Sequence, residues 1–192
     1  MLWIPEFELG IWNAWIFIIW PIVIFISGSS IVKDKEVIKR LSVSIPMKFE
    51  KILNIQKMAS IIIGVIYSIF LPLQLNTIWF YIGLLLFLFG LILQLTVLYT
   101  WRKAKPDGPF TTGPYRYSRH PLYFGLFLMI ISISIMSLSW LFLLIVIILA
   151  ISLLITVPAE EQYCLKTYGK EYQDYMQRTP RWIGLPKSGV KK

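Results

Sequence analysis

Long apolar runs separated by short polar segments dominate the chain. Three of these runs, residues 9–26, 58–75 and 78–99, contain no charged side chain. A helix needs about 20 mostly apolar residues to cross the hydrocarbon core of a bilayer, and each run is close to that length. The runs therefore predict three transmembrane helices.

A fourth apolar run covers residues 122–157 and is too long for one membrane helix. At about 1.5 Å of rise per residue it would extend for about 54 Å, well beyond the roughly 30 Å of hydrocarbon. Two helices, 122–137 and 140–157, joined by a turn at 137–139, fit the bilayer better. The pattern predicts an all-α integral membrane protein with five transmembrane helices, forming a single domain over residues 1–192.

Composition excludes the main alternatives to a membrane protein. Hydrophobic residues make up 57% of the chain, and the mean hydropathy is +0.68. A disordered chain needs low hydrophobicity, and a soluble domain of 192 residues could not bury so large an apolar excess. With one cysteine and one histidine, the chain lacks the residues for a disulfide framework or a Cys/His metal cluster, so we expect no metal site.

The basic residues predict how the helices are oriented. All 19 Lys and Arg residues fall within 32–57, within 100–121 or after residue 157, and the turns at 74–77 and 137–139 have none. Because cytoplasmic segments are enriched in Lys and Arg, we expect the N-terminus outside and the C-terminus in the cytoplasm. The net charge of +9 is then explained by anionic lipid headgroups, and we expect no nucleic-acid binding. Residues 27–57 mix apolar and basic positions at a spacing typical of an interfacial helix.

Two clusters on the predicted cytoplasmic side could carry chemistry. The first, residues 108–125, contains three prolines, three glycines, three tyrosines, two arginines and the one histidine, His120. Glycines permit close approach of the backbone to a ligand, and prolines fix turns, so the composition suits a binding loop. The alternative is an interface loop, in which tyrosines form an aromatic belt and arginines contact lipid phosphates.

The second cluster begins at Pro158, Glu160 and Glu161 and continues as an amphipathic pattern with Tyr168, Tyr172, Tyr175 and Met176. A proline followed by two carboxylates predicts a helix start, where negative charge complements the helix dipole. An ionisable pair this close to the membrane also needs a partner. Candidates are Arg116, Arg119 or a cationic ligand.

Together these clusters resemble a known family. The run Gly113-Pro-Tyr-Arg-Tyr-Ser-Arg-His-Pro-Leu-Tyr-Phe-Gly125, followed by Glu160-Glu161 and by Tyr168-Gly169, Tyr172, Tyr175 and Pro180-Arg181, is similar to the isoprenylcysteine carboxyl methyltransferases and their prokaryotic relatives. Phospholipid N-methyltransferases share the C-terminal pattern. The resemblance covers roughly residues 95–185 of the chain.

The resemblance implies that S-adenosylmethionine binds on the cytoplasmic side, between segments 100–121 and 158–185, in a pocket covered by the amphipathic C-terminal helix. The residues it implies for cofactor binding are Asp107, Gly108, Pro109, Phe110, Tyr115, His120, Pro121, Leu122, Tyr123 and Glu160. Aromatic faces can stabilise a sulfonium cation, and a carboxylate can accept hydrogen bonds from hydroxyl or ammonium groups. We expect Arg119 to orient an anionic acceptor or the cofactor carboxylate. The alternative is that Arg119 contacts a lipid phosphate at the membrane surface.

The methyl acceptor is left open. The isoprenylcysteine enzymes have a substrate-contacting arginine four residues before the carboxylate that matches Glu160, and here that position is Thr156. A prenylcysteine-like carboxylate or another lipophilic acceptor reaching the site from the bilayer is expected first. A phospholipid amine would need a base such as Glu161 to remove its proton. A reductase of the sterol-reductase type and a non-enzymatic membrane protein are the remaining alternatives.

Overall fold

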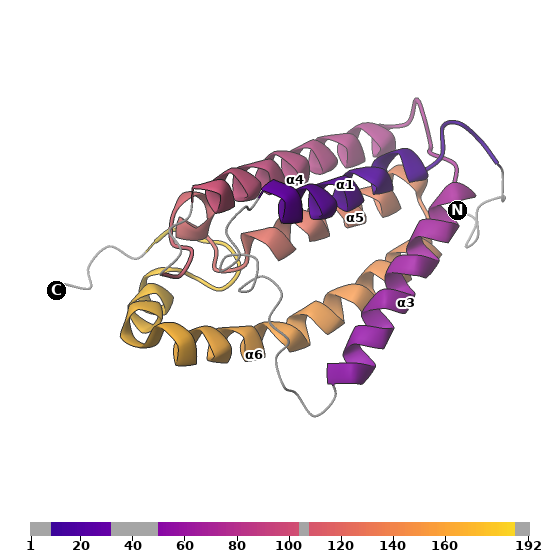
Figure 1. The fold of residues 1–192 in the computed structure, drawn as a ribbon. Helices are drawn as coiled ribbons and strands as arrows, with labels where there is room; N and C mark the ends of the chain where they lie inside the picture. The colour runs from indigo at the N-terminus through magenta and orange to yellow at the C-terminus, as the bar shows by residue number, and fades with distance from the viewer. Residues whose placement is uncertain (1–8, 32–49, 104–107, 187–192) are drawn as a thin grey trace.

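The structure is a computed structural model that describes residues 9–31, 50–103 and 108–186. The regular elements in these residues are all helical, which confirms the predicted all-α class for this part of the chain (Figure 1). In order they are α1 (Trp15–Ile31), α3 (Glu50–Ile69), α4 (Ile78–Arg102), the 3₁₀ turn η1 (Gly113–Arg116), α5 (Pro121–Ser137) and α6 (Trp140–Arg178).

Three of these helices, α3, α4 and α6, are long and apolar enough to cross a membrane. The apolar helices α1 and α5 are shorter, and five spans remain a prediction. The interfacial helix expected within 27–57 falls largely on residues 32–49, which lie outside the described residues. The apolar part of α6, residues 140–157, matches the last predicted span, and the helix continues beyond it.

The first two helices are displaced from the predicted apolar runs because the ends of those runs pair with each other. Asn13 and Pro72 form an isolated antiparallel bridge: the Ala14 amide donates to the Leu71 carbonyl at 2.9 Å, and the Leu73 amide donates to the Trp12 carbonyl at 3.3 Å. As a result α1 starts at Trp15 and α3 ends at Ile69. Hydropathy alone does not distinguish an apolar helix from an apolar extended segment.

Three segments without basic residues meet at one end of the bundle, which we call the turn end (residues 12–14, 69–77 and 136–139). The Gln74 backbone amide donates to the Met136 carbonyl at 2.8 Å. The Asn13 side-chain amide donates to the Ile69 carbonyl at 2.7 Å. The Tyr67 hydroxyl lies 3.1 Å from the Ser139 hydroxyl. These contacts bring together the segments that the charge pattern assigned to one side of the membrane.

Helices α4 and α5 approach closely along their length because small residues lie between them. A Cβ placed on Gly83 would stand 2.9 Å from the Ser132 carbonyl oxygen, and one on Gly90 would stand 2.9 Å from the Gly125 carbonyl oxygen. The Gln94 side-chain amide donates to the Leu122 carbonyl at 2.8 Å. Small residues with an occasional polar contact are typical of helices that associate in membranes.

Helix α6 corrects one sequence prediction. Pro158 does not start a helix but lies inside α6, which runs through it without a break from Trp140. A long helix held by its neighbours can tolerate the one hydrogen bond that a proline removes. The direction changes later, at Gly169, where φ is +54°. The chain then turns back towards α4 and α5 (Figure 1), and Tyr172 and Tyr175 are buried, as their helical spacing predicts.

Candidate active site

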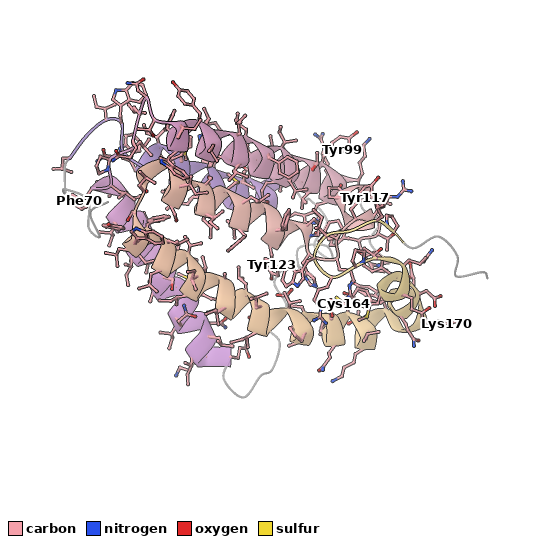
Figure 2. All side chains as sticks on the ribbon, turned by 180° about the vertical axis from the view of Figure 1, so that it is seen from behind. Phe70, Tyr99, Tyr117, Tyr123, Cys164 and Lys170 are labelled. Carbon is pink, nitrogen blue, oxygen red and sulfur yellow. The ribbon has the colours of Figure 1, made fainter. Side chains whose placement is uncertain are left out.

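A cavity of about 190 Å³ lies at the end of the bundle opposite the turn end (Figure 1), which we call the site end (residues 101–103, 108–123 and 157–186). Its lining comes from the end of α4, the segment through η1, the start of α5 and the second half of α6. In Figure 2, Tyr123 of α5 and Cys164 of α6 lie on the facing sides of these two helices. The lining residues are Trp101, Pro109, Phe110, Tyr115, Arg119, His120, Leu122, Tyr123, Glu160, Tyr163, Cys164, Tyr168, Tyr172 and Tyr175.

Eight residues that the sequence analysis proposed line this cavity: Pro109, Phe110, Tyr115, Arg119, His120, Leu122, Tyr123 and Glu160. The other four lie elsewhere. Pro121 is buried as the first residue of α5, and Gly108 lies next to the Glu171 carboxylate. Glu161 is buried beside the cavity without lining it, and Asp107 lies outside the described residues.

One wall of the cavity is aromatic. The Phe110 ring lies between Trp101 and Tyr115, with ring centroids 6.3 and 5.4 Å away. The Trp101 indole N–H donates to the Tyr115 hydroxyl at 2.9 Å, and the Tyr175 hydroxyl donates to the Tyr115 carbonyl at 2.7 Å. Burial raises the pKa of the Tyr115 phenol far above its ordinary value of 10.0, so this wall stays uncharged.

The Glu161 carboxylate is the centre of an ion-pair cluster. Arg181 contacts it through two nitrogens, with Nη2 2.6 Å from Oε2 and Nε 3.1 Å from Oε1. Arg119 Nη2 and His120 Nε2 each lie 3.3 Å from Oε1. Burial alone would raise the pKa of Glu161, but the hydrogen bonds from His120 and Arg181 and the charges of Arg119 and Arg181 outweigh it and lower the pKa from 4.5 to about 2.

The neighbouring carboxylate, Glu160, has different surroundings. Its side chain is 26% exposed, against 3% for Glu161, and it lines the cavity. The Tyr123 hydroxyl donates to one of its oxygens, and His120 Nδ1 lies 3.7 Å from the other. The His120 ring stacks on the Tyr123 ring with an interplanar angle of 3°. Nδ1 of His120 faces the Glu160 carboxylate, and Nε2 faces the Glu161 carboxylate.

The segment after α6 holds the loop that carries Arg119 and His120. The Arg119 amide donates to the Pro180 carbonyl, and the Gly184 amide donates to the Tyr117 carbonyl, both at 3.0 Å. Sequence reasoning gave Arg181 no role, although the Pro180-Arg181 pair is part of the resemblance. Its two-nitrogen contact with Glu161 depends on this return of the chain, which no local pattern predicts.

Arg119 has donors that the described part of the chain leaves unused. Its side chain is 10% exposed and lines the cavity, and neither Nε nor Nη1 has a hydrogen-bond partner among the described residues. Buried guanidinium nitrogens without a partner are suited to bind a carboxylate or phosphate, because the flat fork of donors matches both groups.

These features define a class of protein: a helical membrane protein with a partly aromatic cavity at one end of its bundle, beside a buried carboxylate and an arginine with open donors. Comparison with known proteins agrees with this description. Residues 78–171, from the start of α4 into the last part of α6, match the phospholipid methyltransferase family. Over this stretch, just under half of its length, the chain is similar to this family of membrane methyltransferases, which use S-adenosylmethionine as methyl donor.

A curated relative points to the same group. Over 77 residues the chain is 31% identical to a protein-S-isoprenylcysteine O-methyltransferase of Dictyostelium discoideum. The matched stretch is 40% of this chain and spans about a third, 32%, of that relative's length. The resemblance drawn from the two sequence clusters is confirmed at the level of the family.

Proposed function

We propose that this protein transfers a methyl group from S-adenosylmethionine to the carboxylate of an isoprenylcysteine-like lipid. The observation that carries the proposal is the composition of the cavity wall. Arg119, with two guanidinium nitrogens that lack a partner among the described residues, the partly exposed carboxylate of Glu160, and the rings of Tyr115 and Tyr123 all belong to the lining of one cavity. Their chemistry fits a cofactor that combines a carboxylate, hydroxyl and ammonium donors and a positively charged sulfur.

Each residue then has a physical role. Arg119 Nε and Nη1 bind a carboxylate, and Glu160 accepts hydrogen bonds from hydroxyl or ammonium groups. The rings of Tyr115 and Tyr123 would stabilise a sulfonium cation held in this cavity, and Pro109, Phe110 and Leu122 would exclude water from it. The bound cofactor supplies an electrophilic methyl group, and the protein contributes alignment of that group with the acceptor.

The Glu161 cluster favours a carboxylate acceptor over an amine. Methyl transfer to a carboxylate needs no proton removal, whereas an ammonium acceptor must first lose a proton to a base. With a pKa of about 2 and two guanidinium contacts, Glu161 is a weak base and holds Arg119 and Arg181 in place. We therefore assign Glu161 a positioning role. The second candidate, phospholipid N-methylation, is favoured by the family match.

Purified protein in detergent, supplied with methyl-labelled S-adenosylmethionine, tests the proposal. We expect label to enter an S-farnesylcysteine derivative with a free carboxylate as a base-labile methyl ester. The carboxamide of that derivative is the matched control and should remain unlabelled. Label in phosphatidylethanolamine alone would establish the second candidate. Oxidation of a nicotinamide cofactor without methyl transfer would overturn both.

We further propose that the site end faces the cytoplasm, because two of the three basic segments of the sequence, residues 100–121 and the residues after 157, contribute to it. With Cys164 replaced by alanine, a cysteine at exposed Asn76 should react with an impermeant reagent added to intact cells. A cysteine at exposed Lys170 should react after the cells are opened. The reverse pattern would place the site outside.

A further inference from the structure

The two oxygens of the Glu161 carboxylate are shared unequally among the groups around them. Arg181 contacts both oxygens: Nη2 lies 2.6 Å from Oε2, and Nε lies 3.1 Å from Oε1 and 3.2 Å from Oε2. Arg119 Nη2 and His120 Nε2 both lie 3.3 Å from Oε1. Oε2 is therefore occupied by Arg181, and Arg119 shares the other oxygen.

Only one of the two arginines has the pairing that a guanidinium and a carboxylate prefer. The preferred pair has two hydrogen bonds side by side, because two nitrogens of the guanidinium match the two oxygens. Arg181 makes this pair with Glu161, whereas Arg119 contacts the carboxylate through Nη2 alone. Nε and Nη1 of Arg119 have no partner among the described residues, and the side chain lines the cavity.

Backbone contacts on either side of Arg181 hold it next to the loop that carries Arg119. The Arg119 backbone amide donates to the Pro180 carbonyl at 3.0 Å, and the Ser118 hydroxyl donates to the Arg181 carbonyl at 3.4 Å. The Arg181 side chain is 42% exposed and is not part of the cavity lining. We therefore expect any influence of Arg181 on a ligand in the cavity to pass through Glu161.

We propose that Arg181 is a positioning residue: by pairing with both oxygens of Glu161, it leaves Nε and Nη1 of Arg119 available to a carboxylate bound in the cavity. Without Arg181, Arg119 would pair with both oxygens itself and use these donors within the protein. The inference rests on the proposed function and deepens it, because it names the residue outside the cavity on which carboxylate recognition depends. The carboxylate can belong to S-adenosylmethionine or to the acceptor lipid, and the experiment separates these two sources.

Equilibrium binding of ligands that differ by one carboxylate to the detergent-purified chain tests this without turnover. The first pair is S-adenosylmethionine and its decarboxylated analogue, and the second is S-farnesylcysteine acid and its methyl ester. The wild type should bind the acid of at least one pair about tenfold more tightly. In Arg181→Leu that ratio of Kd values should fall to about one, because the acid binds more weakly and its partner binds as before. The pair that responds identifies the carboxylate that Arg119 binds.

Two further variants separate the contact with Glu161 from general effects of charge and folding. Arg178→Leu is the matched control, because this exposed arginine donates to the Asp174 carbonyl of its own helix, and it should keep the wild-type ratio. Arg181→Gln keeps a polar side chain but loses the charge and the fork of donors, so it should lose the ratio as Arg181→Leu does. It provides the test if Arg181→Leu does not fold.

A wild type without a preference in either pair overturns the inference, as does a preference that survives in either folded Arg181 variant. Equal weakening of both members of a pair in these variants shows a general structural role and also overturns it. If the preference for the lipid acid depends on Arg181 but the wild type binds no S-adenosylmethionine, the proposed function fails and the inference stands. If the wild type methylates the lipid acid and the ratios do not change in the variants, the inference alone fails.

Discussion

The two ends of the bundle are held together by different forces. At the turn end (residues 12–14, 69–77 and 136–139), neutral groups join the segments, and no residue in these stretches carries a charge. At the site end, the segments meet around Glu160, Glu161, His120 and two arginines. Ionised groups are expensive to bury, so their concentration at one end indicates function there, while the opposite end serves to lock the helices.

Removing the central charge of the site end should have the largest effect. Glu161→Gln leaves Arg119 and Arg181 without their anion, and breaking a buried pair in this way costs about 3–5 kcal/mol. We expect a lower midpoint of thermal unfolding in detergent, together with weaker S-adenosylmethionine binding. Glu171→Gln, an exposed carboxylate on the same helix, is the control and should change neither. Equal midpoints for the two variants would show that the cluster does not hold this end.

Acid should affect the site end selectively. The pKa of Glu161 is lower in the folded protein than its ordinary value of 4.5, so its ionisation stabilises the fold above pH 4.5. That contribution is lost as the pH falls from 4.5 towards 2. Unfolding midpoints measured across this range should fall more steeply for the wild type than for Glu161→Gln. Parallel pH curves for the two proteins would contradict the assignment.

Adding a methyl group between α4 and α5 near the turn end should lower stability without changing cofactor binding. In Gly83→Ala the new Cβ would lie 2.9 Å from the Ser132 carbonyl oxygen, so α4 and α5 must move apart, at a cost of about 1–3 kcal/mol. The unfolding midpoint should fall, while the Kd of S-adenosylmethionine measured at a temperature where the protein stays folded should not change. A weakened Kd would mean that the two ends are coupled.

Removing a single hydroxyl at the site end should affect cofactor binding more than it affects stability. Tyr175→Phe removes the donor to the Tyr115 carbonyl, which costs about 1 kcal/mol in stability. Because that contact positions the aromatic wall, cofactor binding should weaken by severalfold. Tyr81→Phe, an exposed tyrosine on α4, is the matched control. A change in stability without a change in Kd would limit Tyr175 to a structural role.

The fold could be predicted where the length of an apolar run determines the bounds of a helix. The ranges of α4 and α5 and the start of α6 follow from charge-free runs and from the turn at 137–139. The start of α1 and the end of α3 could not, because Asn13 and Pro72 form a bridge within the mostly apolar ends of their runs, held by hydrogen bonds between segments far apart in sequence. The predicted helix start at Pro158 was wrong because a helix that packs against its neighbours can continue through a proline.

The site could be predicted where a motif keeps its residues adjacent. The cluster from Pro109 to Tyr123 and the carboxylate Glu160 come together as the resemblance implied. Trp101 and Arg181 were missed because their roles arise from tertiary contacts: one packs on Phe110, and the other reaches Glu161 after the chain turns back. From the sequence alone, Trp101 cannot be distinguished from a tryptophan that anchors the end of an apolar helix at the membrane interface.

Calorimetric titration of the detergent-purified chain with S-adenosylmethionine tests whether the cavity at the site end binds the methyl donor. We expect micromolar binding to the wild type and to Glu171→Gln. We expect binding about tenfold weaker or more in Glu160→Ala and His120→Ala, with both variants still folded by circular dichroism. No binding to the wild type, or the same affinity in all four proteins, would contradict this expectation.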